Sequence, residues 1–218
     1  DLIYLKLEGS NPTGHKNDRI AESLVQFASD HGYKHIFVHG TERYMRSILY
    51  FAENTSLEIY SPKTKDTATQ QKIYTKINWL TFKVPPKETA LDYFEKYALE
   101  HNMFFMSEWE SKPFIRSLAI QKITEEIYGK LPEPTDVWTQ FNGGYTLKSI
   151  YHESMRSWVN GSLLKLPKIH CGVKQKVMDR INEDEKLQEI VTTTKANMFV
   201  IDPPMIKEAI KLIKRLEN

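Results

Sequence analysis

A lysine ahead of a predicted helix and a glycine pair far along the chain have the residue types best suited to chemistry. The segment Glu8–Ala21 reads EGSNPTGHKNDRIA, in which Pro12 and Gly14 shape a loop and Lys16 stands near the start of the helix that follows. If local desolvation holds the lysine amine near neutrality, Lys16 can attack a carbonyl and form an imine. For this motif taken alone, an ordinary solvated lysine in the first helical turn is an open alternative.

The second candidate is the stretch FNGGYT at residues 141–146, which follows a predicted strand and opens a predicted helix. Backbone N–H groups at such a junction, together with the positive end of the helix dipole, suit a phosphate group. A plain tight turn at Gly143 and Gly144 explains the same pattern equally well, because glycine adopts turn conformations without steric cost.

Strand-like and helix-like segments alternate along the chain and would position these residues. Alternating or short apolar runs predict strands at residues 2–8, 35–40, 57–62, 79–84, 102–107, 136–141, 167–173 and 198–202. Helical patterns cover residues 16–31, 45–52, 65–77, 87–100, 113–129 and 146–159, and a last helix starts at Pro203. Strands alternating with helices in this way predict mostly parallel sheets with helices on both faces.

The number of predicted strands is high for a single sheet, so we expect an α/β protein of two three-layer α/β/α lobes. Residues 9–108 are predicted to form a smaller lobe that carries the helix of Lys16. Residues 1–8 plus 109–218 are predicted to form a larger lobe that carries the glycine loop.

Composition narrows the class of protein and its partners. The 218 residues carry a net charge of only +2, which is too balanced to indicate a nucleic-acid partner. The single cysteine, Cys171, excludes an intramolecular disulfide and is typical of a reducing compartment. No apolar run approaches the length of a membrane span, and charges interrupt the first apolar stretch, so we expect a cytoplasmic protein without a membrane partner. His31, His35 and His39 straddle a helix end and a strand, so we expect no metal site.

Taken in order, these motifs resemble the fold-type II pyridoxal-phosphate enzymes, the family of threonine synthase, cysteine synthase and the tryptophan synthase β-subunit. LIYLKLEGSNPTGHKNDRIA resembles the family's opening, where Lys-x-Glu and Asn-Pro-Thr-Gly precede the lysine that bonds to the cofactor, followed by Asp-Arg. HIFVHGTERYMRSILYFA and LEIYSP resemble the family's strand, substrate-binding loop, helix and next strand. DVWTQFNGGYTLKSI and PKIHCGV resemble its phosphate-binding loop and the strand after that loop.

The resemblance implies a cleft between two lobes that holds pyridoxal 5′-phosphate. It implies that Lys16 bonds to this cofactor and later acts as the base at the substrate's Cα. Gly40 and Thr41 would lie in the substrate-binding loop, with Thr41 near the substrate carboxylate. Arg43 would stand where the family has an asparagine that contacts the cofactor. The phosphate loop would consist of Asn142, Gly143, Gly144, Tyr145 and Thr146.

The function implied by the resemblance is that of a lyase or synthase that eliminates or replaces a group at Cβ or Cγ of a small amino acid. A homodimer, or a complex with another subunit, is implied in the same way. A gapless match places Asn17 at the family's lysine, although a one-residue adjustment of the loop would restore the aim of Lys16, and the pair His15–Lys16 occurs in some members. The alternative is a catalytically degenerate homologue that acts as a binding, regulatory or partner subunit, which Asn17, Glu42 and Arg43 favour.

Overall fold

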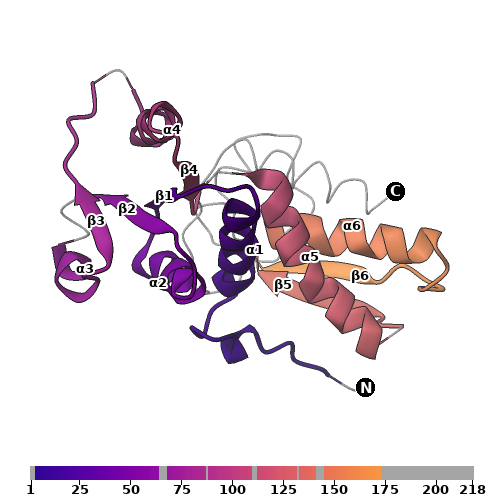
Figure 1. The fold of residues 1–218 in the computed structure, drawn as a ribbon. Helices are drawn as coiled ribbons and strands as arrows, with labels where there is room; N and C mark the ends of the chain where they lie inside the picture. Colours follow the sequence, from indigo (N-terminus) through magenta and orange to yellow (C-terminus); the bar gives the residue numbers. More distant parts are fainter. Residues whose placement is uncertain are drawn as a thin grey trace. The chain divides into compact units, whose positions relative to one another are not determined.

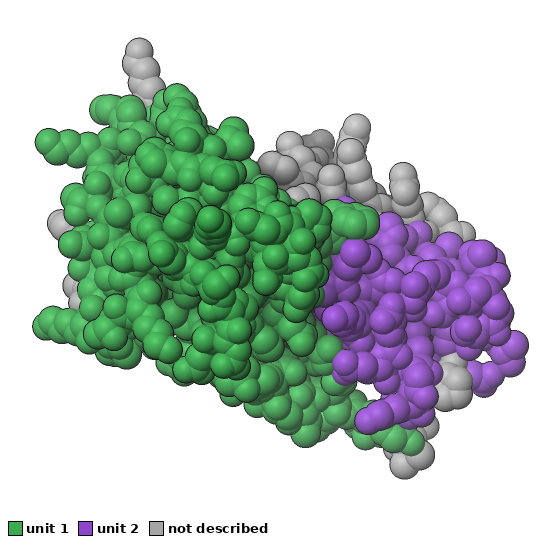
Figure 2. Space-filling view, viewed as in Figure 1, with its two compact units in different colours: residues 1–116 green, residues 117–218 purple. Residues whose placement is uncertain are grey.

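The chain divides into two compact units, residues 1–116 and residues 117–218, which are coloured separately in Figure 2. The computed structural model describes residues 3–63, 68–86, 88–109, 112–131, 133–140 and 145–172. The lobe limits expected from the sequence, residues 9–108 against residues 1–8 with 109–218, stay a prediction.

The first unit is built on a four-stranded sheet in the order β3-β2-β1-β4, in which every pair is parallel. Figure 1 shows its strands, which are β1 (His35–His39), β2 (Glu58–Pro62), β3 (Ile77–Leu80) and β4 (Phe104–Ser107). Its helices are η1 (Glu8–Ser10), α1 (Asn17–Asp30), α2 (Glu42–Ala52), α3 (Ala68–Ile73) and α4 (Ala90–Glu100). The register aligns a buried apolar row across all four strands, formed by Ile77, Ile59, Ile36 and Phe104.

Helices cover both faces of this sheet because successive strand residues point to opposite sides. Phe37 and Phe105 face one side and form a buried cluster with Phe94 of α4. Phe104 faces the other side, where its ring lies 5.4 Å from that of Phe27 on α1. The α/β class with a parallel sheet between helices is therefore confirmed.

The helices α1 and α2 pack against each other through apolar stripes. On α1 the stripe is spaced by four residues, at Ile20, Leu24 and Ala28, all of them buried. On α2, Met45 and Ile48 belong to a buried stripe of the same kind. The spacing that predicted these helices is the spacing that packs them together.

The strand predicted at residues 2–8 is wrong over its described part. Residues 3–7 form no strand, and the apolar side chains of Ile3, Leu5 and Leu7 are exposed. Alternation predicts which face a strand would bury, but it does not supply the neighbouring strand that hydrogen-bonds it. The strand predicted at residues 198–202 and the helix predicted from Pro203 lie outside the described residues.

The second unit contains a pair of parallel strands and two helices within its described part. Here α5 (Pro113–Lys130), which begins in the first unit, and α6 (Tyr145–Val159) accompany β5 (Asp136–Gln140) and β6 (Lys168–Gly172). Val137 pairs with Ile169 in the parallel register. No helix within the described ranges is both long and apolar enough to cross a membrane.

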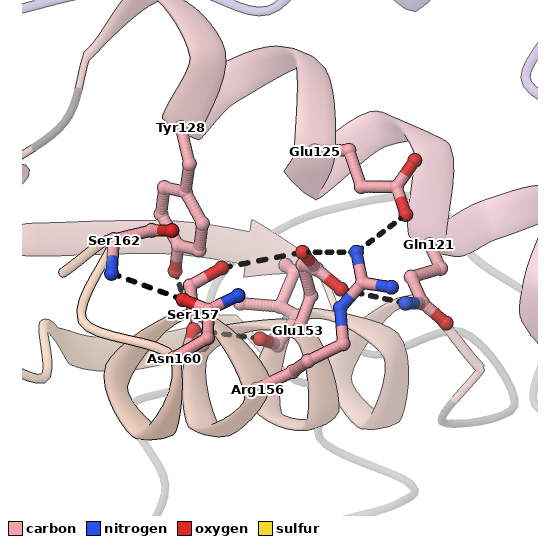
Figure 3. Close-up of polar contacts among 10 residues, drawn as sticks. Gln121, Glu125, Tyr128, Glu153, Arg156, Ser157, Asn160 and Ser162 are labelled. Carbon is pink, nitrogen blue, oxygen red and sulfur yellow. Dashed lines mark hydrogen bonds and ion pairs between the residues drawn. The ribbon is translucent and has the colours of Figure 1, made fainter.

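A polar network joins α5 to α6, as Figure 3 shows. The carboxylate of Glu153, whose residue is 3% exposed, accepts hydrogen bonds from Gln121 Nε2 at 2.6 Å, Arg156 Nη2 at 2.7 Å and Ser157 Oγ at 3.2 Å. Tyr128 and Ser154 make a further hydrogen bond between the two helices. Because a buried carboxylate needs its donors, these contacts fix one helix against the other.

Replacing Glu153 is expected to destabilise the chain. Glu153→Ala leaves the donors of Gln121 and Ser157 unsatisfied, so the free energy of unfolding should fall by about 2–3 kcal/mol. Arg156→Ala is the control, because the Arg156 side chain is 56% exposed and its loss should cost less than about 1 kcal/mol. Urea unfolding of both variants measures the difference, and equal losses would contradict the role assigned to Glu153.

Candidate active site

The carboxyl ends of β1 and β4 lie next to each other at the point where the order of the strands in the sheet reverses. The chain crosses from β1 to β2 on one side, whereas β4 pairs with the other edge of β1. Open parallel sheets bind ligands outside the carboxyl ends of their strands at such a point. His39 pairs with Ser107 there, and the N–H of Glu108 donates to the carbonyl oxygen of His39 at 2.9 Å. The predicted residues Gly40 and Thr41 follow β1 directly and therefore lie at this edge.

Lys16 occupies the position before the first residue of α1 and is half-buried. Burial lowers the pKa of its ammonium group, and the Arg116 guanidinium lowers it further, against the opposing effect of the Glu8 and Glu108 carboxylates. A lower pKa raises the fraction of neutral amine, which is the nucleophilic form. The surroundings of Lys16 therefore fit a bound group whose carbonyl forms an imine with the Lys16 amine.

Asn17, the neighbour of Lys16, is turned toward the same edge of the sheet. It is 5% exposed, and its Nδ2 donates to the Glu108 carboxylate at 3.3 Å. Its backbone N–H donates to Nδ1 of His15 at 3.1 Å. Burial lowers the pKa of His15, and the charges of Lys16 and Arg43 add to that effect. Lys16 and Asn17 thus both interact with Glu108, the first through charge and the second through a hydrogen bond.

The Glu108 carboxylate lies at the N-terminus of α2, next to Gly40 and Thr41. Thr41 is the N-cap residue, and its hydroxyl accepts from the N–H of Tyr44 at 3.5 Å. The N–H of Thr41 donates to the Glu108 carboxylate at 2.7 Å, where the positive end of the helix dipole favours a negative charge. A Cβ at Gly40 would lie 2.6 Å from Cδ1 of Tyr44 and 3.0 Å from Cβ of Glu108. Only glycine allows this approach without displacing a neighbour.

Asp18 anchors the loop before α1 to α2. Its carboxylate, at a residue that is 1% exposed, accepts from the N–H of Thr13 at 2.6 Å and from Oγ of Ser47 at 2.5 Å, and the Thr13 hydroxyl also bonds to it. Arg19 binds the Glu8 carboxylate through Nε at 2.8 Å and Nη2 at 2.9 Å. The loop that carries Lys16 is therefore held by both its own helix and α2.

The two charged residues at the start of α2 differ in their contacts. The Glu42 carboxylate pairs with Arg46 at 2.7 Å and accepts from the Tyr74 hydroxyl at 3.4 Å. Arg43, predicted to contact the cofactor, is exposed, and its charge acts on His15. Glu42 is thus engaged away from Lys16, whereas Arg43 lies on the side of the His15–Lys16 pair.

The predicted phosphate loop is described only at its borders. Three of its predicted residues lie outside the described part of the chain: Asn142, Gly143 and Gly144. β5 ends at Gln140 and α6 begins at Tyr145, so the predicted strand and helix are present on either side. Thr146 lies in the first turn of α6 and is partly buried. The N-terminus of a helix of this length attracts phosphate.

Two residues that act on Lys16, namely Glu108 and Arg116, are not among the site residues predicted from the sequence. Glu108 directly follows a predicted strand, and its place at a carboxyl end could have pointed to it. Arg116 donates through Nη1 to the Ser107 carbonyl oxygen and through Nη2 to that of Glu108 at 2.6 Å. No sequence signal predicts this contact between Arg116 and the end of β4. Among the described residues, no group of three or more His, Cys, Asp or Glu could hold a metal ion.

A methyl group at position 40 is expected to disturb the site. Gly40→Ala forces the Tyr44 ring or the Glu108 backbone to shift, which should lower the free energy of unfolding by about 1–3 kcal/mol. Gly9→Ala is the matched control, since its Cβ would meet nothing within 4 Å. Denaturant unfolding compares the two, and a loss confined to the Gly9 variant would contradict the steric argument.

His39 is expected to make folding stability depend on pH. Its ring lies 5.0 Å from that of Phe94 and 4.7 Å from that of Trp109, and burial lowers its pKa from 6.5 to about 4 although Glu108 opposes this. The unfolded chain therefore binds a proton that the folded chain does not, so the stability present above about pH 6.5 is lost as the pH falls toward 4. His39→Phe should reduce this loss in unfolding experiments, whereas the exposed His101→Phe should leave it as in the parent chain.

No protein-family model matches the chain, and no curated protein matches its sequence. Solved structures match it by fold. Serine racemase from Dictyostelium discoideum superposes with a TM-score of 0.63 at 13% identity, over 93% of this chain and 66% of that one. For threonine deaminase isoform 2 from Solanum lycopersicum the TM-score is 0.64 at 11% identity, over 95% of this chain and 58% of that one.

The O-acetylserine-dependent cystathionine beta-synthase from Helicobacter pylori gives a TM-score of 0.56 at 18% identity, over 78% of this chain and 56% of that one. The matched region thus spans less than two thirds of the length of each of these structures. At such identities the likeness concerns the fold, and it confirms the expected architecture: the chain has the α/β fold of the fold-type II pyridoxal-phosphate enzymes.

Proposed function

We propose that this chain binds pyridoxal 5′-phosphate at Lys16 and acts as a lyase or synthase that eliminates or replaces a group at Cβ or Cγ of a small amino acid. The observation that carries the proposal is the place of Lys16 before α1, within electrostatic reach of Glu108 at the end of β4 and of Arg116, where burial lowers its pKa. Structures of the same fold include a threonine deaminase and an O-acetylserine-dependent cystathionine beta-synthase, which supports chemistry on small amino acids.

The residues of the chain divide the work by their chemistry. Lys16 would hold the cofactor through its side-chain nitrogen, because a neutral amine is the form that attacks a carbonyl. The cofactor, when bound, supplies an electron sink for the bonds at the substrate's Cα. The same amine, once released, would accept the Cα proton, since a lowered pKa brings it closer to the working pH.

Two helix N-termini would bind the anionic groups. The N-terminus of α6, where Tyr145 and Thr146 lie, would favour the cofactor's phosphate together with Asn142, Gly143 and Gly144. The N-terminus of α2, with Gly40 and Thr41, would favour the substrate carboxylate, because the Thr41 N–H already donates to a carboxylate there. Arg43 would add positive charge near His15.

A second candidate function is that of a catalytically degenerate homologue, which would act as a binding, regulatory or partner subunit. The hydrogen bond from Asn17 to Glu108 favours it. A gapless alignment places Asn17 where the family has its lysine, and the Asn17 side chain is engaged by another residue of this chain. Under either function we place the protein in the cytoplasm as a homodimer or in a complex with another subunit, without a nucleic-acid or membrane partner.

Covalent trapping separates the two functions. The full chain is incubated with pyridoxal 5′-phosphate, reduced with borohydride and digested, and mass spectrometry identifies the modified lysine. We expect one dominant adduct on the peptide that contains Lys16, lost in Lys16→Ala and kept in Lys34→Ala, which removes an exposed lysine of the same unit. Absorbance of the unreduced protein in the visible region should follow the same pattern.

The possible results have distinct meanings. An adduct dominant on another lysine would overturn the assignment of Lys16 but keep the cofactor. Absence of an adduct at any lysine would overturn the enzyme function and leave the degenerate homologue as the better account.

A further inference from the structure

We infer that the N-terminus of α2 is a carboxylate-binding site that the chain fills with its own Glu108, so that an external carboxylate binds only by displacing this side chain. The inference deepens the proposed function, because an amino-acid substrate would bring such a carboxylate. It concerns only this chain's own residues, however, and needs no cofactor for its test.

Glu108 contacts the site as a ligand would. One carboxylate oxygen accepts from the Thr41 N–H at 2.7 Å and the other accepts from Asn17 Nδ2 at 3.3 Å. The first donor is the N-cap residue of an 11-residue helix, and the second is the first residue of another helix. Charge-assisted hydrogen bonds from two directions, at the positive end of a helix dipole, are what a bound carboxylate requires.

The surrounding charge suits an anion. The charge of Arg116 lowers the pKa of Lys16, and Glu108 acts on Lys16 in the opposite sense. Arg116 also donates to the carbonyl oxygens of Ser107 and Glu108, which holds the backbone that carries the Glu108 side chain. With Glu108 removed, the positive charges and the two donors would stay in place without their anion.

A buried hydroxyl beside Glu108 also points to a ligand. Tyr44 is fully buried, and its hydroxyl has no hydrogen-bond partner among the described residues. Its ring lies 5.9 Å from the Arg116 guanidinium carbon, and the charges of Arg116 and Glu108 both act on it. A buried hydroxyl without a partner costs free energy, so a ligand at this site would have a further polar group to meet.

Glu108 follows the end of β4, and separate contacts hold its backbone and its carboxylate. Its backbone is fixed by the N–H bond to the His39 carbonyl oxygen and by Arg116, whereas its carboxylate depends on Thr41 and Asn17. Competition between this tethered carboxylate and a free one therefore sets the affinity of the site. It makes Glu108 an autoinhibitory residue.

Titration with propionate tests the inference on the full chain without pyridoxal 5′-phosphate. The backbone amide resonance of Thr41 is followed by NMR, and propionamide serves as the neutral probe of the same shape. We expect Glu108→Ala to bind propionate at least about tenfold more tightly than the parent chain, with Thr41 among the shifted amides and no response to propionamide. Glu22→Ala, a charge change on the exposed face of α1, should bind as the parent chain does.

A second substitution tests the donor itself. Thr41 has a φ of −67°, which proline also adopts, so Thr41→Pro removes the N–H with little change in backbone direction. In the Glu108→Ala background this change should abolish the gain in propionate affinity, whereas Thr41→Ser should keep it.

Glu108→Gln guards against a folding defect, because glutamine keeps the shape and an acceptor oxygen while losing the charge. It should also bind propionate more tightly than the parent chain. Unchanged affinity in both Glu108 variants, or tight binding that leaves the Thr41 amide unaffected, would overturn the inference. Neither result bears on the adduct at Lys16, so failure here and failure of the proposed function can be told apart.

Discussion

The parallel pairing of β1 with β4 is the constraint on which the candidate site depends. It places the loop after His39 beside the residues after Ser107, so the N-terminus of α2 and the side chain of Glu108 meet at one edge of the sheet. The loop before α1 reaches the same edge through Asn17. Three segments far apart in the sequence therefore share one small region because two strands run in the same direction.

Local patterns predict most of the described elements of this fold. The patterns are the apolar spacing of α1 and α2 and the short apolar runs of β1 and β4. They are visible in the sequence because the buried positions of these elements carry apolar residues. The segment at residues 3–7 shows the limit of this reasoning, because its alternation is equally regular and yet no described strand pairs with it. Pairing depends on the rest of the molecule, which a local pattern does not contain.

The candidate site is predictable only in part, for a related reason. Lys16 and Thr41 stand in recognisable local motifs, whereas Glu108 and Arg116 matter through contacts that the tertiary fold creates. The question of register between Lys16 and Asn17 illustrates this best. One helical step rotates a side chain by about 100°, so the sequence suggests that only one of the two residues faces the site. In the structure both interact with Glu108, Lys16 through its charge and Asn17 through a hydrogen bond.

The close approach at Gly40 has a consequence for how this chain can vary. The space that a Cβ would need is taken by the ring of Tyr44, four residues later on the next helix, and by Cβ of Glu108 from another strand. A larger residue at position 40 is therefore compatible only with a smaller one at position 44 or a displaced chain at position 108. In related sequences these three positions should change together, and such covariation would record the packing of the site independently of any ligand.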